Sequence, residues 1–318
     1  MNPCFSLSHT DPEPGGVCLR SLIILGRPCP LDKQSWGKHT SEAATGVRVG
    51  YAADLHSDVA QYEQLAALAW REKVGALILG GDLCGHTWEP AVQVQFVTTF
   101  LSEWLRRVDV PVYAIPGNVD WPPAYAAMQA LARAGRLRLL RAEPVQLEHG
   151  LFAIGYPYVP TTPFRRKFWE RRDRATDRVT LRDGSVGCTL DGTVYPLAPD
   201  ALNHLPSIED DLTGLTHLPE AIIAVIHSPP YGGALDVARD GRHAGSRALA
   251  AWIAREQPLL ALHGHIHESP AVSGRWAEWR GRTLCINPGR GEALHAIVFD
   301  TTALPHSVQH TVYGPLLG

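Results

Sequence analysis

Short apolar runs alternate with amphipathic helical patterns along most of this chain, and the alternation limits the folds that it can adopt. Helical periodicity is present at 59–73, at 91–108, near 123–135 and between Ser246 and Pro258. The apolar runs have the length of buried strands and end in polar residues; they lie at 47–56, 76–82, 111–118, 151–157, 221–230, 258–267 and 283–289. Continuous apolar strands separated by helices predict an α/β fold in which helices cover a parallel sheet.

Two parts of the chain depart from this alternation. Residues 1–45 are rich in proline, glycine, serine and threonine and show no sustained period. We expect them to form a poorly ordered extension that can be removed without loss of stability. Residues 46–318 are predicted to form one domain, which a charged segment with aromatic residues interrupts at about 161–205.

Composition excludes several classes of protein. The chain has 318 residues and is 45% hydrophobic, which is enough for a sizeable core. A formal net charge of -3 gives no general attraction to nucleic acid or to an anionic membrane. No apolar stretch is long enough to span a membrane, and the six cysteines are scattered without paired spacing. We therefore expect a reduced, cytoplasmic protein without a membrane partner, and the sequence indicates no stable protein partner.

Side chains that bind metals follow the predicted strands. Five apolar runs end in carboxylate, imidazole or amide groups, in this order: Asp54 and His56, Asp82, Asn118, His227, and His265 with His267. Ligands of open α/β sheets collect beyond the carboxyl ends of the strands. Imidazole mixed with carboxylate, without thiolate, suits manganese, iron or zinc. Seven ligands are too many for one tetrahedral ion, so the pattern predicts two divalent metal ions that share a carboxylate.

The same residues resemble a known family. The motifs D-x-H, G-D, G-N-x-D, H and G-H-x-H follow one another between residue 47 and about 300, in the order of the calcineurin-like metallophosphoesterase superfamily. The chain is most similar to a bacterial and archaeal subgroup of that superfamily. The resemblance implies a four-layer α/β/β/α sandwich.

The resemblance also implies roles for the individual residues. Asp54, His56 and His267 would hold one metal ion. Asn118, His227 and His265 would hold the other, and Asp82 would bridge the two. The implied reaction is hydrolysis of a phosphate ester by a hydroxide between the ions, with Asp82, Asn118 and His227 as catalytic ligands. His263 would point to the opposite face and be structural.

The chain departs from the family pattern at Val119, where many members carry a histidine that donates a proton to the leaving group. A general acid contributes roughly 10²–10⁴-fold to a rate, so its absence favours substrates that need no protonation. We therefore predict a phosphodiesterase. Two alternatives stay open: a phosphomonoesterase with a relocated acid, such as His86 or His243, and a metal-binding interaction scaffold without turnover. Asp120 is expected to orient a histidine restored at position 119.

Three further residues are candidates for contact with the substrate, which we expect to be a small phosphate ester and which a nucleotide would fit. His243 precedes a predicted helix N-terminus, where backbone N–H groups can bind phosphate. Arg171 and Trp169 lie in the charged insertion. Its basic run is either a solvated face with internal ion pairs, or a lid that attracts anions and stacks a base on Trp169. Cys84 is expected to pack in the core, and Asn287 to stabilise a turn.

Overall fold

The computed structural model describes residues 46–148 and 150–316. The predicted extension at residues 1–45 lies outside the described residues, so its removal without loss of stability stays a prediction.

The first large sheet of the described chain joins strands from both ends of the domain. Its strand order is β17-β16-β15-β1-β2-β3-β4. The parallel part consists of β1 (Arg48–Ala52), β2 (Ala76–Gly80), β3 (Val112–Ile115) and β4 (Arg138–Leu139). The antiparallel part consists of β15 (Ile297–Asp300), which pairs with β1, and of β16 (Gln309–His310) and β17 (Gly314–Pro315).

A second large sheet holds the later apolar runs. Its strand order is β13-β14-β12-β11-β6-β5. Its parallel centre consists of β6 (Leu151–Tyr156), β11 (Ile222–Ile226), β12 (Leu260–Leu262) and β14 (Thr283–Ile286). Its antiparallel edges are β5 (Val145–Glu148) and β13 (Ala277–Arg280). The predicted strands are thus confirmed, but they are divided between two sheets rather than joined in one.

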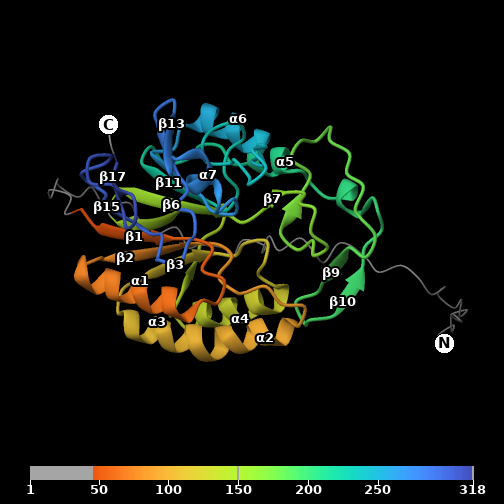
Figure 1. The fold of residues 1–318 in the computed structure, drawn as a ribbon, viewed down its shortest axis with the longest axis horizontal. Helices are drawn as coiled ribbons and strands as arrows, with labels where there is room; N and C mark the ends of the chain where they lie inside the picture. Colours follow the sequence, from red (N-terminus) through yellow and green to blue (C-terminus); the bar gives the residue numbers. More distant parts are fainter. Residues whose placement is uncertain (1–45, 149, 317–318) are drawn as a thin grey trace, which may run out of the picture. The chain divides into compact units, whose positions relative to one another are not determined.

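Helices cover the outer faces of the two sheets (Figure 1). Along the first sheet lie α1 (Val59–Arg71), α2 (Pro90–Phe96), the π-helical turn η2 (Val97–Leu101), α3 (Ser102–Val108) and α4 (Pro122–Arg133). Along the second lie α5 (Ile208–Thr213) and α6 (Arg247–Glu256), and α7 (Ser269–Ser273) follows the histidine-rich segment. The order of layers is helix, sheet, sheet, helix, which confirms the predicted sandwich. None of the described helices is both long enough and apolar enough to cross a lipid bilayer.

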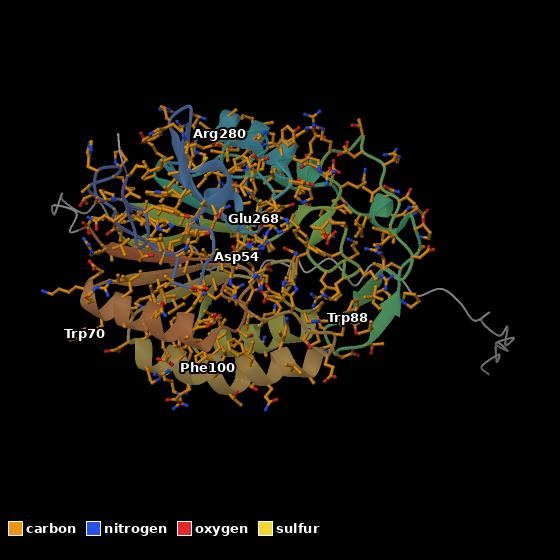
Figure 2. The ribbon with its side chains drawn as sticks, viewed as in Figure 1. Asp54, Trp70, Trp88, Phe100, Glu268 and Arg280 are labelled. Atoms are coloured by element: carbon orange, nitrogen blue, oxygen red, sulfur yellow. The ribbon has the colours of Figure 1, made fainter. Side chains whose placement is uncertain are left out.

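The core lies between the sheets and beneath the helices. Side chains on a strand alternate between its two faces, so a strand buried on both faces must be apolar throughout. In β11, Ile223 and Val225 pack into the core between the sheets, whereas Ile222, Ala224 and Ile226 pack with residues of α5 and α6. In Figure 2, Asp54 lies in the interior, whereas Trp70, at the end of α1, is 86% exposed.

A hydrogen bond joins the two sheets next to the metal-binding motifs. The hydroxyl of Tyr51, in β1, donates to the carbonyl oxygen of His263, just after β12, at 2.7 Å. The ring of His263 is fully buried, and its Nδ1 lies 3.0 Å from the carbonyl oxygen of Ile226. Burial lowers the pKa of His263 to about 4, so the ring is neutral. These contacts give His263 a structural position, as the sequence predicted.

The charged insertion forms small elements of its own. β8 (Glu170–Arg171) pairs with β7 (Val159–Pro160), β9 (Val186–Cys188) pairs with β10 (Val194–Pro196), and η3 (Ala201–His204) follows. Lys167 Nζ and Glu170 Oε2 form a buried ion pair at 2.8 Å. The guanidinium of Arg172 donates to the carbonyl oxygens of Leu202, Ala175 and Leu205.

The expectation of a solvated charged face is therefore wrong for the centre of the insertion. Lys167, Glu170, Arg171 and Arg172 are all buried. The physical reason is that irregular backbone leaves carbonyl oxygens without partners, and buried lysine and arginine donors satisfy them. Arg165, Arg174 and Arg178 remain exposed.

Tyr51→Phe should lower the free energy of unfolding by about 1–2 kcal/mol, because it leaves the buried carbonyl of His263 without its donor. Urea denaturation of the metal-free protein measures this loss. Tyr125→Phe is the matched control, since the hydroxyl of this buried tyrosine bonds no described residue. Equal stability of the two variants would contradict the proposed contribution of the inter-sheet bond.

Candidate metal centre

The polar residues that follow the strands of the first sheet meet at one point. Asp54 and His56 follow β1, and Asp82 follows β2. Ligand atoms of these three side chains all lie within 4.8 Å of one another. Parallel strands end at the same edge of a sheet, which explains how residues of two separate loops come together.

Asn118 follows β3 of the first sheet, and the second sheet contributes the three remaining predicted ligands, His227, His265 and His267. His227 follows β11, and its Nε2 lies 3.4 Å from Asp82 Oδ1 and 3.2 Å from Asn118 Oδ1. The backbone N–H of His265 donates to both carboxylate oxygens of Asp54, at 3.1 and 3.2 Å. The ring of His267 lies edge-on to that of His56, with centroids 5.8 Å apart. The structure thus places all seven predicted ligands at the meeting point of the two sheets.

The imidazoles are prepared to bind a cation. His227 Nδ1 lies 2.8 Å from the carbonyl oxygen of Gly80, which fixes a proton on Nδ1 and turns Nε2 toward Asp82 and Asn118. Both ring nitrogens of His56 are buried and have no hydrogen-bond partner among the described residues. Burial lowers the pKa of His56 to about 4, so its ring is neutral. An unpaired buried nitrogen is unfavourable, and a divalent transition metal would satisfy it.

Buried carboxylates give the site its negative charge. Burial raises the pKa of Asp54 to about 6, against the effect of the nearby His227. Burial alone would also raise the pKa of Asp82, but His227 and His56 hold it well below its usual range. The same contact works in the other direction: Asp82 overcomes the effect of burial and raises the pKa of His227 to about 9. This combination of carboxylate and imidazole fits a divalent metal.

The backbone at the site is strained and closely packed. Asp54, His56, Asp82 and His265 all have left-handed backbone angles, with φ between 47° and 65°. Non-glycine residues seldom adopt this conformation, and it concentrates at functional sites. A Cβ at Gly117 would lie 2.3 Å from Asp82 Oδ1 and 2.6 Å from His227 Nε2. The glycine of the G-N motif is therefore required by the close approach of two ligands.

Asp120 connects two loops of the site. Its carboxylate accepts N–H groups of Gly117 at 2.8 Å, Cys84 at 2.7 Å and Leu83 at 3.2 Å. Burial, reinforced by Asp82, raises the pKa of Asp120 to about 7. The expectation that Asp120 would orient a histidine at position 119 is not supported, because three backbone donors already occupy its oxygens.

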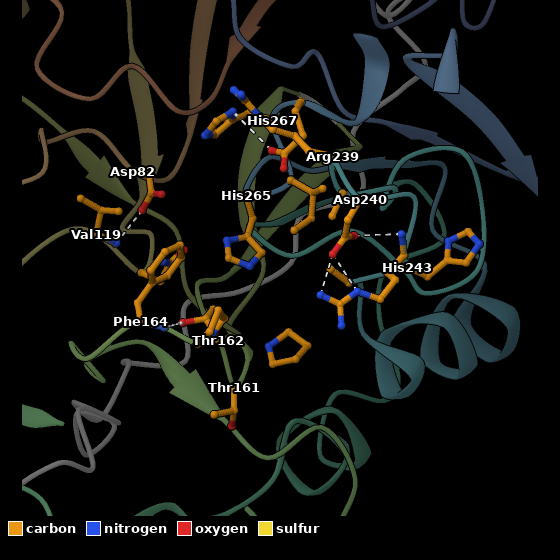
Figure 3. A pocket seen from close by; sticks show the side chains of 18 of the residues that line it. Asp82, Val119, Thr161, Thr162, Phe164, Arg239, Asp240, His243, His265 and His267 are labelled. Carbon is orange, nitrogen blue, oxygen red and sulfur yellow. Dashed lines mark hydrogen bonds and ion pairs between the residues drawn. The ribbon is translucent and has the colours of Figure 1, made fainter. Parts of the chain in front are cut away.

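A pocket of about 570 Å³ opens above the predicted ligands. Its floor includes His56, Asp82, Asn118, Val119, His265 and His267. One wall is formed by residues 160–164 and the other by residues 238–240 and 242–244. Figure 3 shows Thr161, Thr162 and Phe164 from the first wall, and Arg239, Asp240 and His243 from the second. His86 also lines the pocket, and burial and the charge of Arg166 lower its pKa.

Of the three residues predicted to contact the substrate, only His243 lines the pocket. Its Nδ1 lies 2.8 Å from Oδ1 of the buried Asp236. Trp169 is 4% exposed and donates its indole N–H to the carbonyl oxygen of Asp120. Arg171 is 5% exposed, and its guanidinium lies 4.0 Å from the centre of the Tyr158 ring. The predictions for Trp169 and Arg171 are therefore wrong, because pairing of β7 with β8 packs this segment into the insertion.

Sequence reasoning missed the residues of the first wall. Thr161, Thr162 and Phe164 line the pocket, and Phe164 is 55% exposed. They follow β6, whose carboxyl end lies at the same edge of the second sheet as that of β11. The rule that ligands bind beyond strand ends could have found them, but they lack the side chains that bind metals.

Cys84 and Asn287 have the structural positions that the sequence predicted. Cys84 is fully buried, and burial raises the pKa of its thiol. The Asn287 amide donates to the carbonyl oxygens of Leu235 and Ile266, and its Oδ1 accepts the N–H of Gly289. Asn287 therefore holds the turn that follows β14.

Gly117→Ala should reduce the amount of metal that the protein retains, because the new methyl group would displace Asp82 and His227. Elemental analysis after dialysis against limiting Mn²⁺ measures the effect. Gly214→Ala is the control, since its Cβ would meet only the Asp211 carbonyl oxygen at an ordinary 3.6 Å. If Gly117→Ala retained as much metal as the control, close packing at this glycine would not be a requirement of the site.

Comparison with known proteins agrees with this geometry. The family model of the calcineurin-like phosphoesterases matches residues 47–269, more than half of the chain. No curated protein matches the sequence. The protein TT1561 of Thermus thermophilus has a similar fold, with a TM-score of 0.51 and 16% identity over 84% of this chain and 98% of that one.

Two further solved structures have lower TM-scores and the same 12% identity. An archaeal phosphodiesterase has a TM-score of 0.40 and covers 80% of this chain and 94% of its own. A dimetal phosphatase from Danio rerio has a TM-score of 0.46 and covers 79% of this chain and 91% of its own. The matched range includes all the motifs that carry the predicted ligands. This chain belongs to the calcineurin-like phosphoesterase family, and it is a metal-dependent phosphoric ester hydrolase.

Proposed function

We propose that this hydrolase is a phosphodiesterase that holds two divalent ions of manganese, iron or zinc. Asp54, His56 and His267 hold one ion, and Asn118, His227 and His265 hold the other. The position of Asp82 supports its role as the shared ligand. Its Oδ2 lies 3.9 Å from His56 Nε2, and its Oδ1 lies 3.4 Å from His227 Nε2. Its two oxygens therefore face different groups of ligands.

The ions, when bound, lower the pKa of water and neutralise the phosphoryl oxygens. The residues of the chain fix the geometry in which this chemistry takes place. The N–H of Val119 donates to Asp82 Oδ1 at 2.8 Å, which orients the shared carboxylate. Asp120 holds the loops after β2 and β3 together, so that Asp82 and Asn118 keep their relative positions. Preorganised ligands of this kind need little rearrangement when the substrate reacts.

Val119 is the observation that favours a diester. Its side chain lines the pocket beside Asn118, is 4% exposed, and has no proton to donate. A diester has one negative charge fewer than a dianionic monoester, and its leaving group can depart without protonation when the alcohol from which it derives is acidic. The pocket also has two walls, which can accommodate the two ester groups of such a substrate.

A phosphomonoesterase is the second candidate. His86 and His243 both line the pocket, and either could supply the proton that position 119 cannot. Contact with the buried Asp236 orients the ring of His243. An interaction scaffold without turnover is the third candidate, which tight metal binding without hydrolysis of any ester would support.

We expect the wild type to hydrolyse aryl or cyclic diesters in preference to alkyl monoesters, with a rate that depends strongly on the pKa of the leaving group. Val119→His should raise monoester turnover and weaken that dependence. The gain should lie near the lower end of the roughly 10²–10⁴-fold range of general acids, because Asp120 is already occupied. A panel of aryl and alkyl esters with Mn²⁺ measures these rates, with Val119→Leu as the control. A wild type that prefers alkyl monoesters would disprove the diesterase proposal.

Metal content tests the assignment of the ligands. Asp82→Ala should lower occupancy of both ions, because both are proposed to share this carboxylate, whereas His267→Ala should mainly remove one. Asp240→Ala removes a carboxylate that also lines the pocket but pairs with Arg242, and it should keep both ions. Two tightly held ions per chain in Asp82→Ala would show that this carboxylate is not shared.

A further inference from the structure

His86 lies beside the metal centre without being one of the predicted ligands. It follows Asp82 by four residues, is exposed and lines the pocket. Its ring stacks on that of His56, with centroids 5.0 Å apart and an angle of 20° between the planes. A group in this position can reach a substrate that is bound above the ligands.

Arg166, from the charged insertion, holds His86 from the other side. Its Nη2 lies 2.9 Å from His86 Nδ1, and its Nη1 donates to the carbonyl oxygen of Thr87 at 2.6 Å. Its guanidinium lies 5.7 Å from the centre of the Trp88 ring and 5.8 Å from that of Trp121. Two hydrogen bonds and two aromatic faces thus fix one guanidinium against the loop that carries His86.

This contact determines which nitrogen of His86 carries a proton. Arginine only donates hydrogen bonds, so the lone pair of Nδ1 must accept the N–H of Arg166. A neutral imidazole whose Nδ1 accepts carries its proton on Nε2. The ring is therefore held as a hydrogen-bond donor through Nε2, with its other nitrogen already used.

We propose that Arg166 is a positioning residue, which fixes His86 as an Nε2–H donor to the phosphoryl group of the substrate. His86 would supply, from the loop after β2, a side-chain N–H that the valine side chain at position 119, in the loop after β3, lacks. The proposal rests on the proposed phosphoesterase site, but it holds for a diester or a monoester substrate. It also gives the charged insertion a function in the active site, through Arg166 rather than Arg171 or Trp169.

The tautomer can be measured directly. In zinc-loaded full-length protein labelled with ¹⁵N-histidine, NMR should show the His86 ring with a protonated Nε2 and an unprotonated Nδ1. The signal is assigned by its loss in His86→Gln. Arg166→Met should abolish this fixed pattern, whereas Arg165→Met, which removes a neighbouring exposed charge, should preserve it. A wild-type His86 protonated on Nδ1, or an unchanged pattern in Arg166→Met, would overturn the positioning role.

Phosphate binding and kinetics test the donor role. His86→Leu should weaken binding of inorganic phosphate to the zinc-loaded protein, and lower kcat/KM on the best wild-type substrate, by roughly 10- to 100-fold. Arg166→Met should change both in the same direction, and Arg165→Met should change neither. His86→Gln should recover part of the loss, because its amide N–H lies near the position of Nε2. Metal content and melting temperature are measured for each variant, and Arg166→Lys, which cannot make both hydrogen bonds, replaces Arg166→Met if that variant fails to fold.

Wild-type phosphate affinity and kcat/KM in a folded His86→Leu variant would overturn the proposal. This result is distinguishable from failure of the diesterase proposal. If the wild type hydrolysed monoesters rather than diesters, the preference assigned to Val119 would be wrong, while the tautomer and phosphate measurements would still decide the roles of His86 and Arg166.

Discussion

The carboxylate of Asp82 is buried where the two sheets end, and the arrangement of the site depends on its surroundings. A buried carboxylate without compensation is strongly unfavourable. Here it accepts the N–H of Val119 and lies beside the rings of His227 and His56. These partners come from three different loops, two on the first sheet and one on the second. The charge of Asp82 is therefore satisfied only when the two sheets are packed in their native positions. The glycine at position 117 and the left-handed backbone angles allow the loops to approach so closely.

The local structure and the place where the polar side chains meet could be predicted from the sequence, because both depend on short-range pattern. Hydrophobic periodicity predicts the strands, and the polar side chains at their ends predict the candidate site. The division of the strands between two sheets could not be derived from hydrophobic periodicity, because an apolar run does not specify the strand with which it pairs. Only the family resemblance implies that division. The burial of Arg171 and Arg172 could not be predicted from the sequence either. Arg172 is satisfied by carbonyl groups of Leu202 and Leu205, about 30 positions away, and composition cannot reveal such partners.

The insertion is hydrogen-bonded to the loops that follow β2 and β3. Trp169 donates to the carbonyl oxygen of Asp120, and Arg166 contacts the carbonyl oxygen of Thr87. One contact reaches the loop after β3, and the other reaches the loop after β2. The buried charges of the insertion contact the first wall of the pocket, because Lys167 Nζ donates to the carbonyl oxygen of Thr162 at 2.7 Å and the Glu170 carboxylate accepts the N–H of Thr162 at 2.8 Å.

The pairing of β1 with β15 has a consequence for synthesis of the protein. Arg48 pairs with Asp300 in the backbone register, and their side chains form an ion pair at 3.1 Å. During translation, β1 leaves the ribosome long before its partner, and its free edge stays unpaired until residues 297–300 emerge. An exposed strand edge can pair with other chains. The nascent chain is therefore prone to aggregation during most of its elongation. The pairing of β15 with β1, which completes the first sheet, must be a late folding event.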